Sequence, residues 1–193
     1  MSLKRTIRPF RTMKPVFLVF CEGETEEAYI NFLRQSYRLP IKVIPHVTGL
    51  SITPALIKRY IRSERIGDND TITCFLMYDL DTESIADKLA ACKGVINISS
   101  SPCIELWFLL HQKEQTASIS ASDCISLMKK SEEEWITYEK GSLSWKQKKF
   151  LWENRLFACV NAKKLPEGKN PSSAVYRLIN SMEDVSRENN QGK

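Results

Sequence analysis

The sequence lacks several features that would identify common protein classes. It has no apolar run near the roughly 20 residues that a membrane-spanning helix needs, and its N-terminus has no apolar stretch typical of a signal peptide. Its six cysteines stand singly, with neither CxxC pairs nor the Cys/His spacing of a zinc site. The Gly-rich loops GxGxxG and GxxxxGK[ST], which cradle phosphates, are also absent. We therefore expect a reducing, cytoplasmic protein without structural zinc, and not a typical nucleotide-binding α/β protein.

The bulk composition is that of an ordinary globular protein. The chain has 193 residues, of which 42% are hydrophobic and 26% charged, enough for one domain with an extension or for two small ones. The net charge of +5 is unevenly spread. Residues 1–15 form a basic arm without acids, and further lysines cluster at 146–149 and 163–169; the arm contains Lys4, Arg5, Arg8, Arg11 and Lys14. Such segments either neutralise phosphates or act as solvated tails.

Residues 16–100 alternate between patterns typical of strands and helices. We predict strands at 16–21, 41–47, 71–78 and 94–98, and helices at 25–37, 53–65 and 84–92. This alternation predicts a parallel sheet with right-handed crossovers. The expected fold is α/β, with a parallel four-stranded sheet flanked by helices. We assign this domain to residues 16–115 and a helical C-terminal region packed on it to residues 116–193.

The C-terminal half reads as helices. Ser101 and Pro102 have the pattern of an N-cap and first helical residue before the apolar run "CIELWFLL". Residues 122–138 and 142–160 have mixed helical patterns that split near Gly141. The segment "NPSS" at 170–173 reads as the N-cap of a last helix, whose apolar stripe contains Val175, Leu178, Ile179, Met182 and Val185.

Acidic residues follow two of the predicted strands. Glu22 follows the first strand, and Asp79 and Asp81 follow the third. Ligands of open parallel sheets bind beyond the carboxyl ends of the strands, so we expect these carboxylates to meet at one edge. Crowded carboxylates raise each other's pKa unless a cation neutralises them, and an oxygen-only donor set favours Mg²⁺ or Mn²⁺. The alternative is structural: Glu24, Glu26 and Glu27 complement a helix dipole, and aspartates form turns.

Four sequence blocks, in order, carry a family resemblance. "VFLVFCEGETEEAYINFL" followed by "TCFLMYDLDT" resembles the Toprim domain of topoisomerases, primases and related nucleases. With "SSPCIELWFLLH" and "NPSSAVYRL" added, the chain more closely resembles the RloB-like proteins, bacterial Toprim proteins encoded beside restriction–modification genes. The resemblance covers about residues 5–185.

The resemblance implies roles for individual residues. Glu22 matches the Toprim glutamate that binds metal or acts as acid or base, and Asp79 and Asp81 match the Asp-x-Asp metal ligands. Glu26 matches the second glutamate of the Glu-Gly-x-x-Glu variant. Thr82 stands where a basic residue is usual, so the expected phosphate contact there is in question. Gly23 keeps its expected place in a tight strand-to-helix turn.

Other residues are secondary candidates. Glu105 is the only acid in an apolar helix, where a carboxylate is rarely buried unless it is paired or binds metal, and we include it among the catalytic candidates. His111 fits a structural cap whose positive charge favours the helix C-terminus, the alternative being a catalytic role. Ser172 is a candidate phosphate contact at a helix N-terminus, the alternative being a plain cap. Trp145 and Trp152, among Lys146, Lys148 and Lys149, form a candidate nucleic-acid face.

Two functions follow from these patterns. The first is a metal-dependent nuclease of the Toprim type, acting on DNA or RNA in restriction or phage defence, with Mg²⁺ or Mn²⁺ activating water and the basic segments holding the nucleic-acid backbone. The second is a non-catalytic accessory subunit of a restriction or defence complex. Topoisomerase activity is disfavoured by the short chain, and primase activity by the missing zinc module. No membrane partner is expected.

Overall fold

The computed structural model describes residues 15–63, 71–80 and 83–191. In the first half, strands and helices alternate as β1 (Val16–Cys21), α1 (Glu24–Tyr37), β2 (Ile41–Ile44), α2 (Pro54–Ser63), β3 (Ile72–Met77), α3 (Glu83–Ala91) and β4 (Ile96–Asn97). The second half contains β5 (Ser100–Ser101), α4 (Ile104–Leu110), α5 (Ala121–Ser131), the 3-10 helix η1 (Glu133–Trp135), α6 (Trp145–Lys163), β6 (Ser172–Ser173) and α7 (Tyr176–Gln191). Every predicted element of residues 16–100 is present, and no end differs from its prediction by more than three residues.

The parallel sheet predicted from the alternation is confirmed. Its strand order is β2-β1-β3-β4, and all three pairings are parallel. The central strand β1 is almost fully buried, and its Val19 lies between Val43 of β2 and Phe75 of β3. Strands buried on both faces read as near-continuous apolar runs, which is why β1 and β3 are recognisable in the sequence.

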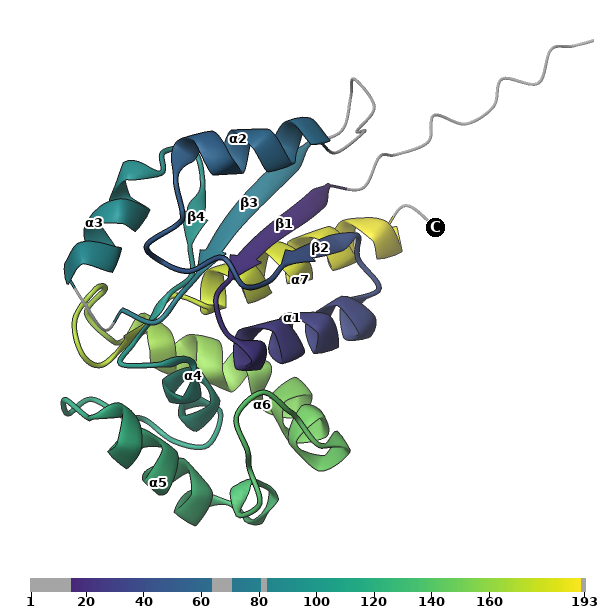
Figure 1. The fold of residues 1–193 in the computed structure, drawn as a ribbon. Helices are drawn as coiled ribbons and strands as arrows, with labels where there is room; N and C mark the ends of the chain where they lie inside the picture. The colour runs from purple at the N-terminus through teal and green to yellow at the C-terminus, as the bar shows by residue number, and fades with distance from the viewer. Residues whose placement is uncertain (1–14, 64–70, 81–82, 192–193) are drawn as a thin grey trace, which may run out of the picture.

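Helices cover both faces of the sheet (Figure 1). Alternate residues of a strand point to opposite faces. Phe17, Val19 and Cys21 accordingly join the core beneath α1, α4, α5, α6 and α7, whereas Leu18 and Phe20 join a smaller core beneath α2 and α3. The larger core includes the apolar stripe predicted for α7. The C-terminal helices and the sheet therefore share one hydrophobic core.

Two predicted helix starts are wrong. Ser101 is not an N-cap: Ser100 and Ser101 form β5, which pairs antiparallel with Ser173 and Ser172 of β6. Helix α4 begins only at Ile104, and α7 only at Tyr176. A Ser-Pro or Pro-Ser-Ser pattern satisfies the local rules for capping, but it carries no information about a strand partner more than seventy residues away.

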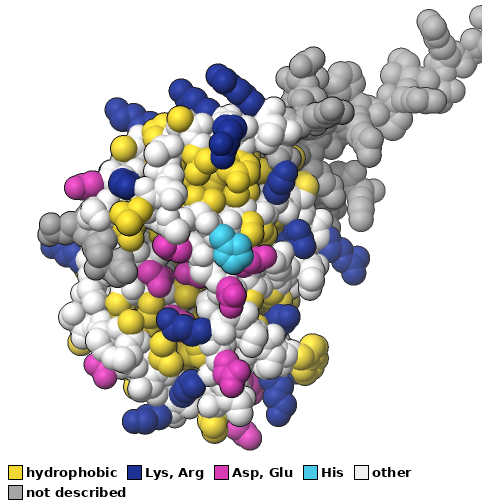
Figure 2. All heavy atoms as spheres, in the orientation of Figure 1, with side chains coloured by type: hydrophobic (Ala, Val, Ile, Leu, Met, Phe, Trp, Pro, Cys, Tyr) yellow, Lys and Arg dark blue, Asp and Glu magenta, His cyan; other side chains and the backbone are white. Residues whose placement is uncertain are grey.

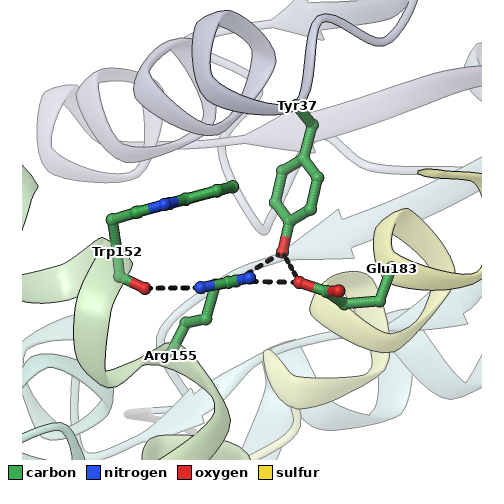
Figure 3. Close-up of polar contacts among 4 residues, drawn as sticks. All are labelled: Tyr37, Trp152, Arg155 and Glu183. Carbon is green, nitrogen blue, oxygen red and sulfur yellow. Dashed lines mark hydrogen bonds and ion pairs between the residues drawn. The ribbon is translucent and has the colours of Figure 1, made fainter. Parts of the chain in front are cut away.

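A polar cluster ties α1, α6 and α7 together (Figure 3). The Arg155 guanidinium donates to Glu183 Oε1 at 2.8 Å and to the Tyr37 hydroxyl oxygen at 3.2 Å, and Tyr37 donates to the same carboxylate oxygen at 2.6 Å. Arg155 also lies 4.1 Å from the centre of the Trp152 ring. Trp152 is therefore part of this inter-helix contact, in contrast to Trp145, which is 73% exposed.

All six cysteines are buried and free. His111 is the C-cap residue of α4, but the expected positive charge is wrong. The side chain is buried, its Nδ1 contacts the Trp107 carbonyl oxygen at 2.8 Å, and burial lowers its pKa to about 3. In the parts of the chain that the structure describes, no helix is both long enough and apolar enough to cross a membrane.

Candidate active site

Carboxylates from four segments surround one pocket at the carboxyl ends of β1 and β3. Glu22 follows β1, Glu26 lies in the first turn of α1, Asp79 follows β3, and Glu105 lies in the first turn of α4. The pocket has a volume of about 380 Å³, and we call it the acidic pocket. Figure 2 shows acidic side chains gathered near the middle of one face, beside a histidine. The fold thus brings together four of the predicted site residues.

Glu26 folds back against the turn between β1 and α1. It is 6% exposed, and its Oε2 lies where a side chain at position 23 would begin: a Cβ on Gly23 would be 2.5 Å from that oxygen. Burial raises the Glu26 pKa, and the charges of Glu105 and Glu22 raise it further. Gly23 is therefore needed for the close approach of a carboxylate, and not for an unusual backbone angle.

Asp79 is the most strongly perturbed acid of the pocket. Burial, followed by the charges of Glu26 and Glu105, raises its pKa to about 8. Its Oδ1 is buried and has no hydrogen-bond partner among the described residues. The carboxylate does accept a hydrogen bond from the Ile104 backbone at the start of α4, which offsets part of the rise. A hydrogen-bonded bridge to Ser100 fixes the backbone at this point.

Glu105 is fully buried in the wall of the acidic pocket. Its Oε1 accepts a 2.8 Å hydrogen bond from the Tyr138 hydroxyl and lies 3.7 Å from the Lys140 ammonium nitrogen. Its Oε2 has no hydrogen-bond partner among the described residues. A buried carboxylate destabilises the fold unless it is paired. Here Tyr138 and Lys140 pair with Oε1, and Oε2 stays unpaired among the described residues.

Lys140 is the residue of this site that the sequence did not reveal. Its side chain is 62% exposed and lines the acidic pocket. The segment carrying it is fixed because the Gly141 N–H donates to Thr25 Oγ1 at 2.9 Å. Gly141 has φ +83°, and a Cβ there would lie 2.7 Å from Glu24 Oε2. In the sequence, Gly141 indicates only a break between two helices, and no spacing connects Lys140 with residues more than thirty positions away.

The chemistry of the pocket fits a hard divalent cation. All acidic side chains present offer oxygen donors, and both Asp79 and Glu105 have a buried oxygen without a partner among the described residues. Within residues 15–63, 71–80 and 83–191, however, no three His, Cys, Asp or Glu side chains form a ready metal-binding group. Glu22 Oε2 instead accepts a 3.3 Å hydrogen bond from the Gly49 N–H. Asp81 lies outside the described residues, so its place in the site stays a prediction.

The predicted nucleic-acid contacts lie apart from the acidic pocket or outside the described residues. Lys4, Arg5, Arg8 and Arg11 belong to the undescribed N-terminal segment. Lys146, Lys148 and Lys149 lie in the first turns of α6, where Lys149 contacts the Trp145 ring and forms a 3.8 Å ion pair with Glu153. Ser172 lies in β6, not at a helix N-terminus, and lines a different pocket. Binding by these residues stays a prediction.

One protein-family model matches most of the chain. The family model described as RloB-like protein matches residues 17–182. The chain belongs to the RloB-like protein family. The RloB-like match includes every residue that lines the acidic pocket and leaves out the basic arm. No curated protein and no solved structure gives a significant match.

Proposed function

We propose that this RloB-like protein is a metal-dependent nuclease of the Toprim type. The observation that carries the proposal is the group of Glu26, Asp79 and Glu105 around one pocket, where burial and mutual repulsion raise the pKa of Glu26 and Asp79. Such an arrangement destabilises the folded chain unless a cation binds. Strongly perturbed acids in a cleft are typical of functional sites, and these lie at the strand ends where α/β proteins bind ligands.

Mg²⁺ or Mn²⁺ would be held by Glu22, Glu26 and Asp79, together with Asp81 from the undescribed segment. Such an ion polarises a phosphoryl oxygen and lowers the pKa of bound water. The chain's own residues perform the remaining tasks. Glu26 and the half-buried Asp79 place their carboxyl groups at the pocket, where a bound cation would favour their charged forms. Glu105, oriented by Tyr138, can accept a proton through its free Oε2.

Lys140 supplies the positive charge that the sequence lacks at Thr82. Its ammonium group reaches Glu105 at 3.7 Å, yet it is largely exposed at the pocket. A phosphodiester entering the pocket would therefore meet a cation beside the Glu105 carboxylate. Because an ammonium is a flexible point charge, we assign Lys140 to holding the phosphate and not to reading sequence. The basic arm and the lysines of α6 would extend this contact along the nucleic-acid backbone.

The alternative function is that of an accessory subunit in a restriction or defence complex. It is favoured by the apolar side chains on the outer face of α6, where Leu156, Phe157 and Val160 are 50%, 48% and 54% exposed. Exposed apolar groups of this kind often mark protein contacts. In that reading the acidic pocket would bind an ion without cleaving a substrate.

A cleavage assay with matched variants separates the two functions. Highly purified protein is incubated with single- and double-stranded DNA and RNA in Mg²⁺, in Mn²⁺ and in EDTA. We expect metal-dependent cleavage that Asp79→Asn lowers by orders of magnitude and that Lys140→Ala lowers mainly through weaker substrate binding. Lys113→Ala, which removes an exposed lysine away from the pocket, should cleave like the native protein. Cleavage of no substrate, or equal cleavage by Asp79→Asn, would reject the nuclease and leave the accessory role.

A further inference from the structure

A second and larger pocket lies at the β4 edge of the sheet. Its volume is about 910 Å³, and its walls come from α3, β4, the end of α6, β6 and the start of α7. In Figure 1, the segment joining α6 to α7 runs close to the lower end of α3. We call this the edge pocket. Its volume is within the range of pockets that bind small organic molecules.

The floor of the edge pocket is apolar. Residues from four parts of the chain contribute to it: Leu80, Leu89, Val95, Ile96 and Leu165. Leu89 is 3% exposed, and the others are half-buried. Burial of an apolar group against such a floor is favourable by about 25 cal/mol per Å². The floor therefore suits a ligand with an apolar or aromatic body.

The rim of the edge pocket is positively charged. The Tyr176 ring has the Lys163 ammonium nitrogen 5.6 Å and the Arg177 guanidinium carbon 5.9 Å from its centre. Arg177 is paired with Glu167 at 2.7 Å, whereas Lys163 has no carboxylate partner in the described part of the chain. One positive charge is thus unbalanced at the mouth of the pocket. An anionic group on the ligand would compensate it.

Neutral polar groups complete the lining. The Ser172 hydroxyl lines the pocket, and the residue is 5% exposed. Asn97 Oδ1 accepts hydrogen bonds from the Ser99 backbone N–H, at 2.9 Å, and from its hydroxyl. The Asn97 amide NH₂ is left without a described partner. These groups can bind the polar edge of a planar ligand, as sites built around a few placed polar groups do.

The edge pocket and the acidic pocket share a wall. Asp79 lines the acidic pocket, and the next residue, Leu80, lines the edge pocket. The Leu80 N–H donates to the Ser100 carbonyl oxygen at 2.7 Å, which fixes this short segment. A ligand in the edge pocket would therefore contact Leu80, the residue next to Asp79 in the chain.

We propose that the edge pocket binds a nucleotide, with the phosphate between Lys163 and Arg177 and the base on the apolar floor. A base provides the planar body with a polar edge, and a phosphate provides the anion, so a nucleotide uses all three parts of the lining. This chemistry has two sources, a free mononucleotide and the 5′-phosphorylated end of a strand. The proposal does not depend on nuclease activity.

Calorimetric titration in EDTA tests the edge pocket while no metal can bind the acidic pocket. The four 5′-mononucleotides, inorganic phosphate and a 5′-phosphorylated oligonucleotide are each titrated into the full chain. We expect saturable 1:1 binding of a mononucleotide or of the oligonucleotide, and weaker binding of phosphate alone. Lys163→Ala should weaken that binding about tenfold, because a charge-assisted hydrogen bond is lost. Lys164→Ala is the matched control, since Lys164 is paired with Glu114 and does not line the pocket.

A blocking variant separates this site from other basic surfaces. Ala90 is exposed on α3 and lines the edge pocket, so Ala90→Trp should fill the entrance without disturbing the core. We expect this variant to abolish binding while its melting temperature stays near that of the native protein. Binding of nothing at millimolar concentrations, equal binding of phosphate and nucleotide, or unchanged binding by Ala90→Trp and Lys163→Ala would each overturn the proposal. Binding of the oligonucleotide alone, blocked by Ala90→Trp, would identify a strand end as the source.

Discussion

Replacement of Asp79 by asparagine tests whether its carboxylate is held in place for a cation. The two side chains have nearly the same size, and asparagine can still accept the hydrogen bond from the start of α4. A carboxyl group whose pKa is raised by folding stabilises the folded state fully below its unfolded pKa and progressively less as the pH rises through its folded pKa. For Asp79 the loss of stability extends from pH 3.8, its ordinary pKa, to about pH 8, its raised pKa in the folded state. Native stability should therefore fall across this pH range, and Asp79→Asn should remove that loss.

The difference between the ordinary and the raised pKa of Asp79 sets the size of the expected stability gain. At 1.36 kcal/mol per pH unit, the difference between 3.8 and about 8 sets an upper limit of about 6 kcal/mol. Asp79 is only half-buried in a pocket open to water, so we expect a gain of about 2 kcal/mol at pH 8. For a chain of 193 residues this corresponds to a melting temperature about 4–8 °C higher. The gain should be smaller at pH 5, where the native carboxyl is protonated in the folded state.

The assay is thermal unfolding at pH 5 and pH 8, in EDTA and in Mg²⁺. In Mg²⁺ the advantage of Asp79→Asn should shrink, because ion binding stabilises the native site more than the mutant site. Asp184→Asn is the control: it removes an exposed carboxylate of α7 that does not line the acidic pocket, and it should change stability by less than about 0.5 kcal/mol. If Asp79→Asn melts below the native protein in EDTA at pH 8, the carboxylate is a structural turn residue and the reasoning fails.

Three further predictions concern other parts of the molecule. Gly23→Ala should displace the Glu26 carboxylate, which would otherwise lie 2.5 Å from the new Cβ. It should reduce the rise in melting temperature caused by Mg²⁺, while the far-UV circular dichroism stays native. An unchanged rise would show that Glu26 does not bind the ion. Arg155→Met should lower the free energy of unfolding, measured in urea, by about 2–3 kcal/mol, because it leaves the half-buried Glu183 carboxylate without its ion pair. A decrease under about 0.5 kcal/mol would contradict a stabilising role for this ion pair. Charge reversal of four basic-arm residues should flatten the salt dependence of nucleic-acid binding by about one unit of slope per lost phosphate contact, and an unchanged slope would make the arm a passive tail.

The fold could be predicted well where local sequence and burial coincide. Val16–Cys21 is an apolar run because β1 is buried on both faces of the sheet, so its boundaries are visible in the residues themselves. The alternation of such runs with helical patterns was enough to predict a parallel sheet. It also placed Glu22 and Asp79 at the same edge, since the carboxyl ends of parallel strands coincide.

The sequence failed where a residue's environment depends on distant partners. Ser101 and Ser172 have good helix-capping patterns, but they pair with each other across β5 and β6. His111 has an ordinary place at a helix end, yet burial keeps it neutral. Local rules describe what a segment can do in isolation, and pairing or desolvation by a segment far along the chain overrides them.

By itself, the sequence therefore determined the parallel α/β fold, the position of its acidic strand ends and the family resemblance, because each is carried by contiguous residues. Only the tertiary structure decided what surrounds those acids. It buried Glu105 beside Tyr138, brought Lys140 to the acidic pocket and formed the edge pocket from segments between Leu80 and Arg177. These features arise when the C-terminal helices pack against the sheet, and side chains that meet through packing share no spacing along the chain.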